Sequence, residues 1–583
     1  MRLMPELLRE RADADPDSLA YTFLDDGERE GARLTWGEVD RRASALASAI
    51  AASAEPGARA LILCPPGLAF IPAFFGALRA RAIAVSAYPP RTGRAGIDPG
   101  IDPQDRTLAR LRAIASDAAP TVLLAPSALA QRAAAVTALV PELSRATWID
   151  IDGVDQGGAS GVGFRDTRID PGSVAFLQYT SGSTAEPRGV MVTHANLVHN
   201  LADSQALALH DRTSASVSWL PVIHDMGLIQ GVLQPAFSGF PAWLMSPAAF
   251  LQRPARWLRA ISVTGATISG GPNFAYELCV RRVSDQEREG LDLRRWRLAF
   301  NGAEPIRQST LDAFRDTFAP CGFDAAAFRP CYGLAEATLL VTTGRGATTS
   351  CGHAAPGTDI RIVDPNTLRP ADRSAPGEIW VAGPGVAAGY WNQPEATTSI
   401  FDAWIAGSGE GPFLRTGDLG VLGEDGLHVT GRIKDILIVR GIKHFPQDIE
   451  ETVERASAWV RAGCCAVFAM PGADGDRVAV AAELESAGAV PDEGDMRDAM
   501  ILNIREAIGA AHGIQVSAVA LVAPGAIPKT TSGKLQRFAC REGLLSGRLT
   551  PLSFWAAACP ERGRGACPER GRGAGAPGLA EAS

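Results

Sequence analysis

Residues 176–189 combine hydroxyl, glycine and cationic residues at a spacing that suits the binding of a polyphosphate. An apolar run, 174–177, leads into them as a strand leads into a loop. The loop then provides Thr180, Ser181, Gly182, Ser183, Thr184 and Arg188. Phosphate oxygens accept hydrogen bonds from backbone N–H groups, small hydroxyls and cations. The spacing does not match the Walker A sequence, which disfavours a P-loop NTPase, and a surface loop rich in Ser and Thr is the alternative for this stretch alone.

Three later stretches could supply the other contacts of a nucleotide. Residues 298–305 read as a strand and a tight turn, in which Gly302 and Ala303 leave room for a flat base. Residues 331–338 combine an aromatic ring, which suits stacking on adenine, with a carboxylate that suits Mg²⁺. Residues 414–420 contain a carboxylate that could accept hydrogen bonds from both ribose hydroxyls. Each motif is weak alone, and their order along the chain strengthens the interpretation.

An apolar binding wall is predicted in the middle of the chain. His224 and Asp225 stand at the start of an apolar helix, and residues 226–252 carry no charge. An uncharged run of this kind could line a channel for an apolar ligand. The alternative is structural, with the acid capping the helix beside a locally satisfied histidine.

Lysine is rare in this chain, which otherwise uses arginine for positive charge. Of 56 basic residues only four are lysine, and they occur in two short stretches: Lys434, Lys443, Lys529 and Lys534. A lysine side chain carries a compact ammonium on a flexible stem, a shape that the planar guanidinium of arginine cannot imitate. These lysines are therefore candidates for a functional role. Survival by chance on a solvated face is the alternative for any one of them.

Length and composition bound the class of protein. The 583 residues are too many for one core and predict two or more domains. Hydrophobic content of 46% and charged content of 21% are typical of globular proteins. A net charge of −8 gives no reason to expect binding to nucleic acid or to an anionic membrane surface.

Cysteine usage and the N-terminus predict a cytoplasmic location. The ten cysteines show no metal-binding or CxxC spacing, and no secretory pattern follows Met1. Two uncharged runs, 60–78 and 226–252, have the length of membrane spans. Prolines interrupt both runs, so we expect buried core or pocket wall and no stable membrane insertion.

Strand-like and helix-like segments alternate through the first part of the chain. Residues 60–64 read as a strand, 66–80 as a helix and 82–87 as a strand, and the alternation recurs in 108–124 and 175–198. Thr35 is expected to cap a helix that begins at Trp36. This pattern predicts an α/β fold, with mostly parallel sheets and covering helices.

The chain changes character near residue 433. We expect a large domain over 1–432 and a smaller, mobile α+β domain over 433–556. In the tail, 557–583, Ala-Cys-Pro-Glu-Arg-Gly-Arg-Gly occurs twice. Two short copies rich in Gly, Pro and Arg cannot build a solenoid, so this tail is predicted to be disordered.

The motifs, in this order, resemble those of the adenylate-forming superfamily, which includes acyl-CoA synthetases, peptide-synthetase adenylation domains and luciferases. Ala185 stands where that family usually has glycine, and Arg188 where it usually has lysine. Within the superfamily the chain most resembles the fatty acyl-AMP ligases, through residues 87–90, 224–229, 246–257, 270–282, 300–305 and 443–450. The resemblance extends to about Trp555.

The resemblance implies that ATP and Mg²⁺ are used to convert a fatty acid to acyl-AMP with release of pyrophosphate. Lys534, Glu336 and Arg432 would be the catalytic residues, and Glu336 and Thr184 would bind the metal. The nucleotide would be held by Thr180, Ser181, Gly182, Ser183, Thr184, Arg188, Gly302, Ala303, Glu304, Tyr332, Gly333, Asp418 and Arg432. The acyl chain would contact His224, Asp225, Met226 and Gly231, and Lys434 would lie in the hinge.

The resemblance also implies a second step, in which an acyl carrier protein receives the acyl group on its phosphopantetheine, for lipid, polyketide or lipopeptide synthesis. The carrier would act in trans, since no Leu-Gly-x-Asp-Ser attachment sequence occurs here. Fatty acyl-AMP ligases usually have a longer insertion after the 331–338 motif, and this insertion is implicated in discrimination against CoA. Here only residues 341–350 separate the motif from Cys351. A fatty acyl-CoA synthetase therefore stays open as an alternative, and a non-catalytic acyl- or nucleotide-binding relative is a remote one.

Overall fold

The computed structural model describes residues 1–90, 105, 107–156, 168–180, 187–208, 210–372, 375–439, 442–470, 477–485, 494–529 and 535–557. Its contacts divide the chain into two compact units. The first consists of Met1–Thr416 and Gly420–Val429, and the second of Gly417–Leu419 and Thr430–Ser583. The predicted tail lies outside the described residues from 558 onward. The domain boundary at 432–433 and the mobility of the smaller domain stay predictions.

A six-stranded sheet organises the N-terminal part of the first unit. The strand order is β6-β5-β3-β4-β7-β8, and all neighbours are parallel except β7 and β8. The strands are β3 (Arg59–Ile62), β4 (Ile83–Ser86), β5 (Val122–Ala125), β6 (Thr147–Asp150), β7 (Val174–Thr180) and β8 (Arg188–Thr193). The sequence did not indicate β8, because its antiparallel pairing with β7 depends on the chain returning alongside that strand.

A nine-stranded sheet forms the rest of the first unit's framework. Its order is β15-β14-β13-β12-β11-β9-β10-β1-β2, with parallel pairing from β13 through to β1. The strands are β1 (Leu19–Leu24), β2 (Glu30–Thr35), β9 (Ser216–Ser218), β10 (Ala242–Met245), β11 (Ile268–Gly271), β12 (Leu298–Asn301), β13 (Phe328–Gly333), β14 (Leu340–Thr343) and β15 (His353–Ala354).

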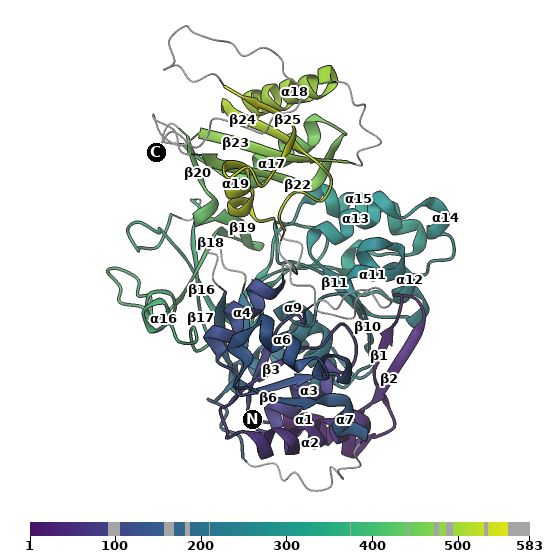
Figure 1. Cartoon of the computed structure of the whole chain (residues 1–583). Coiled ribbons are helices and arrows are strands. Elements are labelled where there is room, and N and C mark those ends of the chain that lie inside the picture. Colours follow the sequence, from purple (N-terminus) through teal and green to yellow (C-terminus); the bar gives the residue numbers. More distant parts are fainter. Residues whose placement is uncertain are drawn as a thin grey trace. The chain divides into compact units, whose positions relative to one another are not determined.

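Helices fill the space between the two sheets and cover their outer faces (Figure 1). Between the sheets lie α1 (Met4–Ala14), α2 (Trp36–Ser53), α3 (Phe70–Arg79) and α8 (His194–Ala208). The six-stranded sheet is covered on its other face by α4 (Thr107–Ala118), α5 (Ser127–Ala130) and α6 (Ala133–Leu139). The nine-stranded sheet is covered by α11 (Pro247–Gln252), α12 (Ala255–Thr264), α13 (Asn273–Arg282) and α15 (Gln308–Phe318).

Local signals for these helices are confirmed in detail. The Thr35 hydroxyl accepts a hydrogen bond from the Glu38 N–H at 3.3 Å, and the Glu38 carboxylate accepts from the Thr35 N–H at 2.9 Å. This reciprocal pair satisfies two N–H groups that the first turn of α2 leaves without helical partners. The expected α/β fold with mostly parallel sheets and covering helices is confirmed.

Shorter elements complete the first unit. A third sheet has the order β16-β17-β18-β19. Its strands are β16 (Asp359–Val363), β17 (Gly377–Ala382), β18 (Leu414–Gly423) and β19 (Gly426–Arg432), of which β18 and β19 also contain residues of the second unit. The remaining helices are α7 (Ile151–Gln156), α9 (Asp225–Leu228), α10 (Gln234–Ser238), α14 (Asp285–Arg288) and α16 (Pro394–Phe401).

The second unit is an α+β structure with its own two-sided core. A hairpin, β20 (Leu437–Val439) and β21 (Ile442–His444), precedes a sheet of order β22-β23-β24-β25. That sheet comprises β22 (Val460–Met470), β23 (Arg477–Leu484), β24 (Val516–Val522) and β25 (Pro551–Ala556). The helices α17 (Pro446–Ala456) and α18 (Gly494–His512) cover one face, and α19 (Arg537–Leu545) covers the other.

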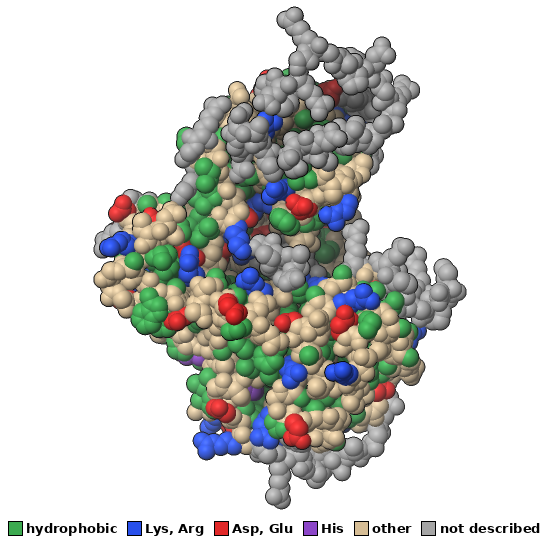
Figure 2. All heavy atoms as spheres, turned by 60° about the vertical axis from the view of Figure 1, so that its left-hand side comes forward, with side chains coloured by type: hydrophobic (Ala, Val, Ile, Leu, Met, Phe, Trp, Pro, Cys, Tyr) green, Lys and Arg blue, Asp and Glu red, His purple; other side chains and the backbone are tan. Residues whose placement is uncertain are grey.

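The two long uncharged runs become several short elements. Residues 60–78 contribute to β3 and α3, and residues 226–252 contain β10 and several short helical segments. In the described part of the chain, no helix is long and apolar enough to cross a membrane. Figure 2 shows basic and acidic side chains interspersed on the face in view.

Candidate functional site

Glu336 lies in a short 3₁₀ turn, Ala335–Ala337, directly after β13. Gly333 ends that strand in a crowded position, where an added Cβ would lie 1.8 Å from the Leu339 carbonyl oxygen. Thr338, just after the turn, has a φ of 68°, a backbone conformation that is uncommon for a non-glycine residue. The backbone around the carboxylate is therefore tightly constrained.

Tyr390 links two of the predicted site residues. Its phenol O–H donates a hydrogen bond to Glu336 Oε1 at 2.8 Å. The guanidinium carbon of Arg188, the first residue of β8, lies 5.2 Å from the centroid of the same ring. The structure thus brings together a cation predicted to bind phosphate and a carboxylate predicted to bind Mg²⁺.

Tyr390 was missed by the sequence analysis. The available signal was an aromatic residue at the end of a stretch punctuated by Gly383, Gly385 and Gly389. Such glycines mark turns and close backbone approaches, but they do not reveal which distant residue the ring contacts.

The 302–304 turn follows β12 and lies beside the end of β13. An added Cβ at Gly302 would come within 2.6 Å of both the carbonyl oxygen and the sulfur of Cys331. Ala303 has a φ of 70°. Parallel strands present ligand sites at their carboxyl ends, and a strained residue there is a recognised mark of a functional turn. The Glu304 carboxylate accepts the Phe274 N–H at 2.6 Å, close to the start of α13.

The ring of Tyr332 belongs to a buried cluster. The residue is 7% exposed, and its neighbours in that cluster include Val341, Ile360 and Ile379. The residue is therefore largely covered by its neighbours. Stacking of adenine on this ring stays a prediction.

The phosphate-loop prediction falls partly outside the described residues. Thr180 ends β7 and pairs in register with Arg188 across the antiparallel strands. The other residues of this prediction, Ser181, Gly182, Ser183 and Thr184, lie outside the described part of the chain. The two ends of the loop are therefore held side by side in the sheet.

The predicted ribose pair is formed within the second unit. Arg432 Nε lies 2.9 Å from Asp418 Oδ1, and the aspartate side chain is only 8% exposed against 59% for the arginine. Lys434 follows in a 3₁₀ turn, Ile433–Asp435. Lys534 lies outside the described residues. Its flanks are close together: Gln536 N–H donates to the Pro528 carbonyl at 3.0 Å, and Lys529 forms a β-bridge with Leu535.

The predicted acyl wall forms a broken helix. His224 occupies the N-cap position of α9, where the structural alternative placed the acid, and Asp225 Oδ1, one residue later, accepts the N–H of Met226 at 2.7 Å. A π-helical turn, Ile229–Leu233, follows and contains Gly231. Such π turns occur often at functional sites. An added Cβ at Gly231 would meet the Ser218 hydroxyl at 3.0 Å.

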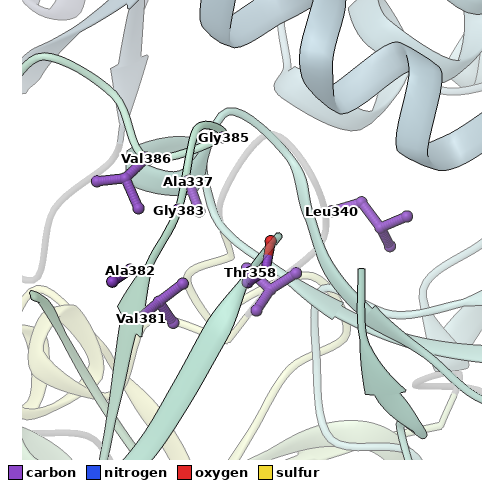
Figure 3. A pocket seen from close by; sticks show the side chains of 9 residues that line it. Ala337, Leu340, Thr358, Val381, Ala382, Gly383, Gly385 and Val386 are labelled. Atoms are coloured by element: carbon purple, nitrogen blue, oxygen red, sulfur yellow. The ribbon is translucent and has the colours of Figure 1, made fainter. Parts of the chain in front are cut away.

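A small pocket lies beside the Glu336 turn. Ala337, Leu340, Val381 and Val386 line it together with the Thr358 hydroxyl (Figure 3). It has room for roughly one water molecule, so it does not hold an acyl chain or a nucleotide. No group of three or more His, Cys, Asp or Glu that could hold a metal ion occurs among the described residues.

Comparisons with known proteins agree over nearly the whole chain. Residues 8–391 match the family model described as AMP-binding enzyme, and residues 434–552 match the one described as Disco-interacting protein 2-like, AMP domain. A medium-chain-fatty-acid–[acyl-carrier-protein] ligase of Moorena producens, JamA, is 41% identical over 93% of this chain and 95% of its own. A long-chain-fatty-acid–AMP ligase of Mycobacterium tuberculosis is 37% identical over 93% of this chain and 97% of its own.

Solved structures show the same relationship. A fatty acyl-adenylate ligase from L. pneumophila, crystallised with acyl adenylate and pyrophosphate, is 36% identical with a TM-score of 0.70. The match covers 95% of this chain and 98% of the solved chain. The resemblance inferred from the motifs is confirmed: this chain belongs to the AMP-binding enzyme family, with fatty acyl-AMP ligases among its relatives.

Proposed function

We propose that this protein activates a fatty acid with ATP, forming acyl-AMP and pyrophosphate, and then transfers the acyl group to the phosphopantetheine of an acyl carrier protein. The observation that carries the proposal is the near full-length similarity to a ligase crystallised with acyl adenylate and pyrophosphate. The similarity to a fatty-acid–[acyl-carrier-protein] ligase supports the choice of acceptor. The acyl carrier protein is expected to act in trans.

In the first step a fatty carboxylate oxygen forms a bond to the α-phosphorus of ATP, and the bond from that phosphorus to pyrophosphate breaks. Both reactants are anionic, so the protein's main tasks are charge neutralisation and alignment. Arg188 and the 180–184 loop would hold the β- and γ-phosphates. Lys534 would bridge the carboxylate and the α-phosphate as negative charge builds up there.

The other predicted residues would position the nucleotide. The 302–304 turn, Tyr332 and Gly333 would hold the adenine, and the constrained backbone of that turn supports this role. Asp418 would accept hydrogen bonds from the ribose hydroxyls, and its ion pair with Arg432 supports a joint role. Lys434 would lie at the hinge of the second unit.

Glu336 fits a Mg²⁺ site of the kind that uses one protein carboxylate together with substrate phosphates. Its carboxylate is oriented by the Tyr390 phenol, and its neighbouring backbone is constrained. Thr184 is the second predicted ligand. When bound, the ion would neutralise phosphate charge and orient the leaving group.

The substrate would reach this site along the 224–231 segment. His224, Asp225, Met226 and Gly231 would form part of the wall that contacts the fatty acid. The π-helical turn that contains Gly231 supports this assignment, because such turns occur often at functional sites.

The acceptor is tested by supplying CoA and a phosphopantetheinylated acyl carrier protein side by side to enzyme that has been loaded with fatty acid and ATP. We expect acyl-carrier thioester to form, while acyl-CoA stays at the level seen without enzyme. The control is the apo carrier protein, which lacks the thiol. Efficient acyl-CoA formation would instead identify an acyl-CoA synthetase, the alternative that the short 341–350 segment leaves open. Absence of AMP and pyrophosphate with every fatty acid tried would point to a non-catalytic relative.

A further inference from the structure

Tyr390 occupies a central position between the two charged groups of the phosphate side. Its phenol donates to Glu336 Oε1 at 2.8 Å, across 54 residues of sequence. Arg188 stands over the face of its ring at 5.2 Å, where the negative face of an aromatic quadrupole attracts a cation. One side chain therefore contacts both the carboxylate and the guanidinium.

The segment that carries Tyr390, residues 383–391, is fixed to the elements on both sides. Residues 388–391 pair with β8 through hydrogen bonds from Trp391 N–H to the Gly189 carbonyl at 2.8 Å and from Met191 N–H to the Gly389 carbonyl at 2.9 Å. The Ala387 N–H donates to the Glu336 carbonyl at 2.9 Å. The segment thus joins the strand that begins with Arg188 to the turn that contains Glu336.

Side chains fix the segment further. Asn196 Nδ2 donates to the Pro384 and Val386 carbonyls at 2.8 and 2.9 Å. The Thr338 hydroxyl donates to the Gly385 carbonyl at 2.7 Å. This last bond involves the residue with positive φ just after the Glu336 turn, so the turn and the segment constrain each other.

The Tyr390 ring is itself held in place. The residue is 6% exposed, and its ring packs edge-on against Phe401 of α16 with centroids 5.2 Å apart. Burial raises the pKa of the phenol, the negative charge of Glu336 raises it further, and the Arg188 cation opposes both effects. Packing against Phe401 therefore holds the ring beside both Glu336 and Arg188.

We propose that Tyr390 is a positioning residue that orients the Mg²⁺-binding carboxylate of Glu336 and the phosphate-binding guanidinium of Arg188 with respect to each other. The inference rests on the proposed function only in assigning those two roles. The inference goes beyond the proposed function because it names Tyr390 as the residue that couples metal binding to phosphate binding.

Substitutions separate the phenol oxygen from the ring. Tyr390→Phe keeps the ring beneath Arg188 but removes the phenol oxygen, which contacts Glu336 and also interacts with Arg188, whereas Tyr390→Leu removes the ring as well. ATP affinity is measured by calorimetry without fatty acid, once with Mg²⁺ and once with EDTA. Removing a group that orients a metal ligand weakens metal binding by about 10-fold or more. In Tyr390→Phe, the ratio of the ATP affinity with Mg²⁺ to the ATP affinity in EDTA should therefore be about 10-fold lower than in the wild type.

For Tyr390→Leu we expect ATP affinity to fall in EDTA as well, because Arg188 loses the ring that supports it. In ATP–pyrophosphate exchange, Tyr390→Phe should require about 10-fold more Mg²⁺ for half-maximal rate. The KM for the fatty acid should stay at the wild-type value. A higher Mg²⁺ requirement with an unchanged KM for the fatty acid indicates a positioning role. A general loss of folded protein would instead lower the rate at every Mg²⁺ concentration.

Tyr21→Phe is the matched control. Tyr21 of β1 is also a buried tyrosine of the first unit, and its phenol donates to the Val232 carbonyl at 2.7 Å. This control should leave the Mg²⁺ dependence of ATP binding unchanged. Wild-type Mg²⁺ dependence in Tyr390→Phe would overturn the inference.

The binding measurement also separates this inference from the proposed function. A wild-type protein that catalyses no exchange with any fatty acid would overturn the proposed function, while a Mg²⁺-dependent effect of Tyr390→Phe on ATP binding would still support the inference. A wild-type protein that binds no ATP would overturn both.

Discussion

At the scale of single residues, the choice between lysine and arginine indicates which positions need a compact ammonium and which need only a positive charge. Arg188 stands where the family usually has lysine, and it lies over the ring of Tyr390, a contact that suits a planar guanidinium. Lys534, by contrast, has stayed lysine in a chain that otherwise uses arginine. A compact ammonium could enter between two anions where a guanidinium would be too wide.

Lys534→Ala should slow acyl-AMP formation by about 10²-fold or more, the size of effect expected when one electrostatic stabiliser of a transition state is removed. ATP–pyrophosphate exchange with a fatty acid measures this step. Lys534→Arg should recover little of the loss, because charge alone does not reproduce the ammonium. Lys529→Ala is the matched control in the same stretch and should have a much smaller effect. Unchanged exchange in Lys534→Ala would refute the assignment.

At the scale of elements, hydrogen bonds within the second unit connect the 3₁₀ turn Ile433–Asp435 to the start of α19. Arg537, the first residue of α19, donates from Nε and Nη2 to both oxygens of Glu450 on α17, each at 2.7 Å. Its Nη1 donates to Asp435 Oδ2 at 2.6 Å, in the turn that also contains Lys434. This network fixes the residue three positions after Lys534 to the predicted hinge segment.

Arg537→Ala should destabilise the second unit by about 3 kcal/mol, because it leaves the Glu450 side chain, only 4% exposed, without its cation. Hydrogen exchange of the full-length protein should show faster exchange in α17, α19 and β22. Arg548→Ala is the control, since Arg548 is exposed and contacts Ser546. Exchange at the wild-type rate in all three elements would contradict the prediction.

At the scale of the whole molecule, buried histidines make the first unit sensitive to acid. Burial lowers the pKa of His194 and of His210 to about 4. The nearby charge of Asp211 opposes this shift at His210. Neither ring nitrogen of His210 has a hydrogen-bond partner within the described ranges, and the ring packs edge-on against Phe240 at 5.7 Å.

Stability should therefore fall with decreasing pH between about 6.5 and 4, because the unfolded chain binds protons there that the folded His210 does not. A shift of this size corresponds to about 2 kcal/mol lost between pH 7.5 and pH 5 from His210 alone. In His210→Leu this part of the loss should disappear, as measured by urea unfolding at the two pH values. His210→Gln, which is polar but does not titrate, should behave in the same way. Wild-type pH dependence in both variants would disprove the assignment.

What the sequence determined by itself was local. Thr35 indicated the start of α2, and the alternation of strand-like and helix-like segments indicated the α/β class, because each signal depends on residues a few positions apart. The motifs around Arg188 and Glu336 likewise carried the family resemblance without any need for their arrangement in space.

The tertiary structure decided which distant residues meet. The strand β8 exists because Arg188–Thr193 can pair with β7, and Tyr390 reaches Glu336 because residues 388–391 pair with β8 in turn. The positive φ of Ala303 is set where the ends of β12 and β13 crowd together. These features follow from backbone pairing between segments far apart in the chain. Sequence patterns among neighbouring residues do not determine which distant segments pair.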